Sequence, residues 1–401
     1  MLRKDFILCK TRNLLNEFIR PITTVADKPR QRFLRQTLKA ILLSGSLVVT
    51  ELAFFIHDKC SDRFYTLKRL LNHLTSTRGD LTPVVTAYHQ TIRRFIQPDT
   101  PILIDVTDIA KPRARKMKYL KLVYDGSESR LVPGYWCVEV YAHLKNKRIL
   151  PLVMDTFGID DPAAKSMNCR IISAIETVNK DFSGNGIWVA DRGFDRLNLL
   201  ETWISQSCNF VVRQRGDRCV VTPNGVRIIV SDLVEHLRQQ RATTAVRCNV
   251  VFCKVRLPDN PKSLYVVSSW LPGKDRPLIL LTSMVVENIE QAGDVIRHYK
   301  QRWVCEEAGR FLKSHVGLER FRIRRYEAIQ RLVILAMLAM AFLTWILLRS
   351  RQLAGSIFSL TSRFRKKSKF VYYRLLDGLQ EFGRLYRLRL GKIPLEPLEN
   401  G

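Results

Sequence analysis

The sequence lacks the short motifs that mark several common kinds of active site. Its 401 residues contain no phosphate-binding GxxxxGK[ST] loop, no GxSxG nucleophile turn and no HExxH zinc helix, and the seven histidines are scattered. The nine cysteines form no CxxC pair and no ligand-like repeat. An odd number of cysteines without a framework argues against structural zinc and indicates a reducing compartment.

Acidic residues are scarce, with 37 Asp and Glu against 66 Lys and Arg, so the net charge is +29. Such an excess of one sign costs folding stability through self-repulsion, and a polyanionic partner is therefore expected. Nucleic acid is the first candidate and an anionic membrane the second. A hydrophobic fraction of 46% argues against disorder, and the length allows two or three structural units.

Long hydrophobic runs are also rare. The only one without charge is "LVILAMLAMAFLTWILL", residues 332–348, which reaches the lower edge of membrane-spanning length and has basic residues at both ends. A helix buried in a large core is the favoured interpretation, and no membrane partner is expected. The first residues, "MLRKDFILCKTRNLLNEF", contain an apolar run too short for a secretory signal, so we expect a cytoplasmic protein.

The hydrophobic patterns predict a mixed α/β core between two helical regions. Residues 1–95 have helical spacing with basic outer faces, and "SDRFYTLKRLLNHL" fits either a recognition helix or a basic solvated face. Buried strands are expected at "PILIDV", "GYWCVEVYAHL", "RILPLVMDTF" and "GIWVADRGF", with helices at "DDPAAKSMNCRIISAIETVNKDF" and "DRLNLLETWISQS". A mostly strand-like stretch follows, and then a helix that starts near residue 288 and continues through 332–348.

This pattern divides the chain into five segments. They are a helical region expected to bind DNA through its basic faces (1–95), the first part of the core (96–208), a β-rich insertion (209–285), the second part of the core with the helix that contains residues 299–313 (286–348) and a basic helical region (349–401).

The stretch "YKQRWVCEEAGRFLK", residues 299–313, carries two adjacent glutamates among many cations. At about 100° per residue, Tyr299, Arg302, Glu306 and Lys313 fall within an arc of roughly 60° on a continuous helix. Glu307 points away and is available for ordinary ion pairs. An Arg-to-Glu pair four residues apart is common on solvated helices, so the spacing alone is weak evidence for a site.

Two aspartates give the stretch its significance. Asp105 ends the apolar run "ILID", and Asp191 ends "IWVAD". A carboxylate emerging from a buried strand is costly unless a cation offsets its charge. Each aspartate alone could simply cap the turn after its strand, and Asp108 is a rival for the role of Asp105. Three carboxylates in a basic chain favour Mg²⁺ or Mn²⁺ and two-metal phosphoryl transfer on nucleic acid.

These residues carry a resemblance to a known family. "YKQRWVCEEAGRFLK" is similar to the Y-(2)-R-(3)-E-(6)-K signature of the insertion-sequence-four family of DDE transposases. "IDVTDI" and "VADRGFDR" resemble the family's first and second aspartate motifs, in the same order. The resemblance covers about residues 100–345.

The resemblance implies a ribonuclease H-like core interrupted by a β-rich insertion, in a bacterial enzyme that cuts and joins DNA. Asp105, Asp191 and Glu306 would be catalytic and bind two Mg²⁺ or Mn²⁺ ions. Tyr299, Arg302 and Lys313 would bind end DNA. The partners would be double-stranded DNA, both transposon inverted-repeat ends and target, and a second copy of the chain on paired ends.

One feature departs from the family, and one alternative stays open. Leu278 occupies the place before "LLT" where related enzymes carry a tryptophan, and aligning the nearby Trp270 would require a shift. A hairpin-forming step is therefore not implied. The alternative function is a catalytically inactive DNA-binding protein descended from such an enzyme.

Overall fold

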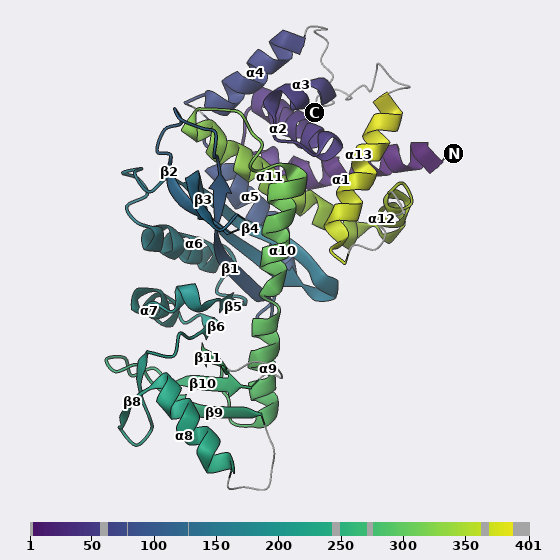
Figure 1. Ribbon diagram of the computed structural model, residues 1–401. Coiled ribbons are helices and arrows are strands. Elements are labelled where there is room, and N and C mark those ends of the chain that lie inside the picture. Colours follow the sequence, from purple (N-terminus) through teal and green to yellow (C-terminus); the bar gives the residue numbers. More distant parts are fainter. Residues whose placement is uncertain are drawn as a thin grey trace.

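The computed structural model describes residues 3–56, 63–77, 79–126, 128–242, 249–270, 276–361 and 369–387. Within them, a mixed sheet forms the centre of a mixed α/β protein, and two groups of helices from opposite ends of the chain gather beside it (Figure 1). The predicted mixed α/β class is confirmed.

The central sheet combines antiparallel and parallel pairing. Its strand order is β2-β3-β1-β5-β6-β11-β10-β9, and β4 also pairs with β3. β1 runs antiparallel to β3 and parallel to β5, which in turn runs parallel to β6. The strands are β1 (Pro101–Ala110), β2 (Lys121–Asp125), β3 (Arg130–Leu144), β4 (Arg148–Phe157), β5 (Ile187–Ala190), β6 (Asn209–Arg213), β9 (Val250–Val255), β10 (Leu264–Ser269) and β11 (Leu278–Thr282). Because β11 pairs with β6, strands β9, β10 and β11 extend the same sheet.

The stretch predicted to be mostly strands also contains a helix. β7 (Cys219–Val221) and β8 (Arg227–Ile229) form a small separate hairpin, and α8 (Val230–Ala242) follows directly. The sequence analysis missed α8, although Val230, Leu233, Val234 and Leu237 recur at helical spacing.

Helices from both ends of the chain surround one apolar helix, α11 (Tyr326–Arg349). α11 packs on β4 and on α1, α2, α4, α12 and α13, and α13 also contacts α2 (Figure 1). The N-terminal helices are α1 (Arg3–Thr23), α2 (Lys28–Ser44), α3 (Val49–Phe55), α4 (Arg63–Thr75) and α5 (Thr82–Ile92); the C-terminal ones are α12 (Arg351–Phe358) and α13 (Val371–Arg387). The N-terminal region is therefore continuous with the core.

α11 is the run of apolar residues that raised the question of a membrane. Among the described helices it is the one whose length and composition pass the test for a membrane span as a single helix, and 83% of its most apolar window is buried inside the protein. Burial of this extent fits the interpretation as a core helix.

The long helix predicted to run through residue 348 is interrupted. It consists of α9 (Ile289–Lys300), α10 (Trp303–Phe311) and a π-helical turn (Leu312–Val316), and Gly317, at φ +79°, ends it. Between α9 and α10 the amides of Gln301 and Arg302 bond three residues back instead of four. The prediction of one continuous helix into α11 is wrong, because Gly317 turns the chain before α11 begins.

Helices α6 (Met167–Asp181) and α7 (Leu197–Ser205) connect the parallel strands. α6 packs on β3 and β4, and α7 packs beside α6. Ser166 begins α6 by accepting a hydrogen bond from the Cys169 amide at 3.2 Å, as a helix cap does. β5 pairs in parallel with the first three residues of β1, so the end of β5 lies beside the middle of β1.

Candidate active site

Asp105 and Asp191 lie on neighbouring parallel strands. In the β1–β5 pairing Leu103 is opposite Val189, and the same register continued by two residues sets Asp105 beside Asp191. The Asp105 carboxylate accepts the Val106 amide at 2.8 Å, and the Asp191 carboxylate accepts the Gly193 amide at 2.7 Å. Asp191 therefore caps its turn, as the simpler interpretation expected, and also faces a second carboxylate.

Arg302 connects Glu306 to this pair. Its Nη2 donates to Glu306 Oε1 at 2.6 Å, and its Nη1 lies 3.8 Å from Asp105 Oδ2. The helix spacing thus brought Arg302 and Glu306 together as predicted. Glu307, one residue on, bonds Arg310 at 2.6 Å instead and takes no part in the cluster.

The negative charges of Asp105, Asp191 and Glu306 exceed the single positive charge of Arg302. Burial raises the pKa of Asp105 to about 6, the charges of Asp191 and Glu306 raise it as well, and Arg302 and the Val106 amide oppose the shift. Burial disfavours the guanidinium too, but Glu306, Tyr299 and Asp105 together outweigh burial and raise the pKa of Arg302. The carboxylates are close enough to affect one another's charge.

The carboxylate oxygens of this cluster are of the type that binds a hard divalent cation, but in this structure they lie too far apart to hold one together. Carboxylate oxygens are the ligands that Mg²⁺ and Mn²⁺ prefer, and the Asp105 side chain is 28% exposed and so accessible from solvent. Within the described part of the chain, however, no three His, Cys, Asp or Glu side chains converge closely enough to hold a metal ion. Arg302 stands between Asp105 and Glu306, where such a cation would bind.

Lys313 and Asp108 form a separate pair. Lys313 Nζ lies 2.8 Å from Asp108 Oδ1 and 3.6 Å from Glu319 Oε1. Asp108 is buried and forms an ion pair with Lys313. Asp105, in contrast, lies beside a second carboxylate, that of Asp191. Lys313 therefore contacts Asp108 and not Glu306, with which it was predicted to share a helix face. Tyr299 lies close enough to Arg302 to raise the pKa of its guanidinium.

Glu139 on β3 is a buried carboxyl that the sequence analysis overlooked. It is the register partner of Asp105, and only 1% of it is exposed. The Tyr141 hydroxyl donates to its Oε2 at 3.0 Å, but its Oε1 has no hydrogen-bond partner among the described residues. Burial, then the charge of Asp105, raises the pKa of Glu139 to about 8. The signal available was a single acid within the apolar run "YWCVEVYA".

A cavity of about 430 Å³ adjoins Asp191. It is lined by Asp191, Arg192, Gly193 and Arg215, and the Arg215 side chain is held by a hydrogen bond from Nε to the Arg192 carbonyl at 3.2 Å. Two arginines beside a carboxylate offer a place for an anionic group such as a phosphate. The sequence analysis did not identify either arginine.

Comparisons with known proteins address the same region. Residues 162–342 match a family model described as a transposase DDE domain, a span that includes Asp191 and Glu306. A cryo-EM structure of a piggyBac transposase synaptic complex with hairpin DNA is similar with a TM-score of 0.46 and 9% identity, over 90% of this chain and 74% of that one. No curated protein matches. Over residues 162–342 the chain is therefore similar to the transposase DDE domain, which supports a DNA transposase.

Proposed function

We propose that this protein is a DNA transposase of the insertion-sequence-four type that cuts and joins DNA by two-metal-ion phosphoryl transfer. The observation that carries the proposal is that Asp105 on β1 lies beside Asp191, which follows β5, while Arg302 links Asp105 to Glu306 on α10. Two of the three carboxylates lie in the part that is similar to the transposase DDE domain.

The strand order supports a ribonuclease H-like core. β4 and β1 each run antiparallel to β3, and β5 and β6 continue on the other side of β1 in parallel. The β-rich insertion, expected at residues 209–285, would then begin after β6 (Asn209–Arg213), because β6 pairs with β5 of the core. We further infer a homodimer on paired inverted-repeat ends, in the bacterial cytoplasm, on the resemblance of the motifs.

Asp105, Asp191 and Glu306 would hold the two metal ions. Mg²⁺ or Mn²⁺ held by these carboxylates would supply stabilisation of the charge on the attacking and leaving oxygens of the phosphodiester. The chain's own residues orient the DNA strand. Arg302, once released from Glu306, can reach a phosphate as a bidentate donor, and Arg192 and Arg215 line the adjoining cavity for the neighbouring phosphate.

The test is DNA cleavage by the full chain on duplexes that carry the inverted repeats flanking its gene. Strand cleavage with Mg²⁺ or Mn²⁺, and none with a chelator, is expected. Tight binding to those duplexes without cleavage under any metal would instead support the alternative of an inactive DNA-binding protein.

Metal affinity should depend on pH through Asp105. A carboxyl must be charged to bind a metal, and burial with the charge of Asp191 raises the pKa of Asp105 to about 6. Affinity for Mn²⁺ should therefore fall about tenfold per pH unit below about pH 6 and level off above it. Calorimetric titration of the DNA-free protein measures this. Asp105→Asn serves as the control, and a wild-type affinity that is flat from about pH 5 to pH 7 contradicts the assignment.

Arg302→Ala should have opposite effects on metal and DNA. It removes the cation that stands between Asp105 and Glu306, so Mn²⁺ should bind the DNA-free protein more tightly. It also removes a phosphate contact worth roughly 1.5–3 kcal/mol, so the DNA complex and cleavage should weaken about ten- to a hundredfold.

Arg302→Lys is the matched variant, since it keeps the charge and loses the planar fork. If Arg302 only pairs with Glu306 on a solvated helix, a contact of about 0.5 kcal/mol, both metal and DNA binding would stay nearly unchanged.

A further inference from the structure

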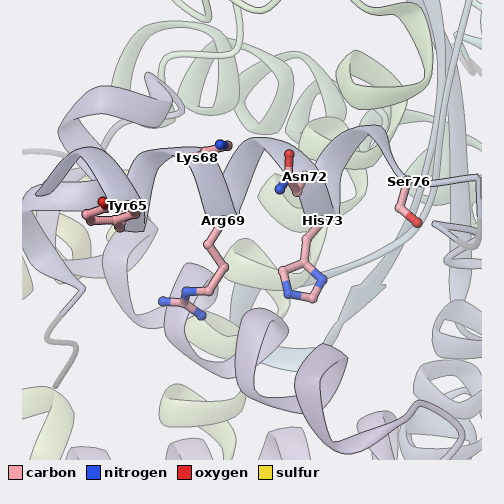
Figure 2. Close-up of a pocket in the computed structure, with 6 residues that line it drawn as sticks. All are labelled: Tyr65, Lys68, Arg69, Asn72, His73 and Ser76. Atoms are coloured by element: carbon pink, nitrogen blue, oxygen red, sulfur yellow. The ribbon is translucent and has the colours of Figure 1, made fainter. Parts of the chain in front are cut away.

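One side of helix α4 is polar and basic, and its outer residues Tyr65, Lys68 and Asn72 are exposed. Thr66, Leu70 and Leu74 are its buried positions, and it packs on α2, α3 and α11. A cavity of about 550 Å³ runs along another side of the helix, lined by Tyr65, Lys68, Arg69, Asn72, His73 and Ser76 (Figure 2). These positions recur every three or four residues, so they form one continuous face.

The framework holds this helix and part of its face in place. Arg331 Nη1 of α11 donates to the Leu74 carbonyl at 2.6 Å, which anchors the end of α4. Arg69 Nη2 donates to Gln36 Oε1 of α2 at 2.9 Å, and the His73 ring stacks on Phe33 at 4.8 Å between centroids. Figure 2 shows Arg69 and His73 projecting side by side from the same side of the helix. A helix that is held in place by contacts with α2 and α11 suits recognition of a rigid partner.

The outer residues have the chemistry of nucleic-acid contacts. Tyr65 is 59% exposed, and Lys68 and Asn72 are exposed one and two turns further on. Neither α4 nor the neighbouring α2 contains an Asp or Glu, so the charge of this surface is positive. Asn can bond an adenine edge with two hydrogen bonds, and Lys can bind a phosphate or a guanine. An α-helix fits the width of the DNA major groove.

We propose that α4 enters the major groove of double-stranded DNA, where Asn72 contacts a base edge and Lys68 contacts the phosphate backbone. The proposal rests on the proposed function only in taking the inverted repeats as the sequence that is read. It gives the N-terminal region a surface that recognises a base sequence, whereas the positive charge of the region alone predicts only DNA binding without sequence preference.

The experiment measures DNA binding by the full chain with a chelator present, so that no cleavage intervenes. The probes are duplexes with the inverted repeats flanking the gene and a duplex with randomised sequence. Asn72→Ala should weaken repeat binding about ten- to a hundredfold, leave randomised DNA nearly unaffected, and relax the preference at one base pair. Point variants are needed because removing residues 1–95 would expose the buried face of α11.

Lys68→Ala should weaken binding to both probes equally and lower the salt dependence by about one phosphate contact. Lys180→Ala is the matched control, because it removes one exposed lysine from α6, outside the N-terminal helices. Melting curves of all three variants should match the wild type, since each residue is exposed.

Two results would overturn the proposal. One is an Asn72→Ala variant that keeps the full preference for the repeats, and the other is a Lys68→Ala variant that behaves like Lys180→Ala. These outcomes are separate from the proposed catalytic function. A protein that cuts repeat DNA but ignores Asn72 and Lys68 contradicts the assignment of α4 alone, and one that reads DNA through α4 but never cuts contradicts the transposase activity alone.

Discussion

Cleavage of repeat DNA should fall by about a thousandfold or more when Asp105, Asp191 or Glu306 is replaced by its amide, Asn or Gln. Each change keeps the side-chain volume and removes a charge that would bind metal. Losing metal stabilisation of the attacking and leaving oxygens is worth several kcal/mol, and about 4 kcal/mol corresponds to a thousandfold. Binding to the same DNA in chelator should persist, because the contacts proposed on α4 lie elsewhere.

Glu307→Gln is the matched control for Glu306. It neutralises the adjacent glutamate, which pairs with Arg310, and should cut normally. An active Glu306→Gln beside an inactive Glu307→Gln would refute the assignment of the helix face. Likewise, an active Asp105→Asn beside an inactive Asp108→Asn would transfer the first ligand to Asp108, and the Lys313–Asp108 pair would then have to open.

The stability of the metal-free protein should depend on pH through Glu139. Burial and Asp105 raise its pKa to about 8 from an ordinary 4.5, so between these values the folded state holds a proton that the unfolded state releases. Its contribution is therefore fully present below about pH 4.5 and is lost as pH rises through about 8, at up to roughly 1.4 kcal/mol per pH unit.

Glu139→Gln removes this titration and keeps the shape and the acceptor for the Tyr141 hydroxyl. The variant should match the wild type near pH 5 and melt at a clearly higher temperature near pH 8. Glu307→Gln again serves as the control. Equal melting temperatures of wild type and Glu139→Gln at both pH values would mean that Glu139 is not a buried neutral acid.

The sequence predicted the main features of the cluster because they follow from local rules. Asp191 follows the end of β5 as predicted, and a four-residue helix spacing brings Arg302 to Glu306. The prediction that Asp105 ends its strand is wrong, because β1 continues to Ala110 in pairing with β3, but the β1–β5 register still sets it beside Asp191. Lys313 is a different case. The tightened turn before Trp303 and the π-helical turn at its own position change the rotation per residue, and it bonds Asp108 instead.

Other features depend on contacts between distant parts of the chain. Glu139 became visible only through the pairing of β3 with β1, which sets it opposite Asp105. Strands β9, β10 and β11 could not be assigned to the same sheet as β6 from local pattern, because the β6–β11 pairing joins residues about seventy positions apart. The burial of α11 could be predicted from its sequence alone, since a helix that is apolar on all sides is buried either in a large protein core or in a membrane.

The central position of α11 also affects how the protein is made. Helices α1, α2 and α4 pack on α11, yet the ribosome reaches Tyr326 only after the N-terminal helices have emerged. At about 5–20 residues per second, the delay between α5 and α11 is roughly 10–50 s. During that time the apolar faces of the early helices that contact α11 in the folded protein remain uncovered by it, and such exposed surface favours aggregation. A chain that stops before residue 326 would lack α11, so the N-terminal helices could not complete the core that they form with it.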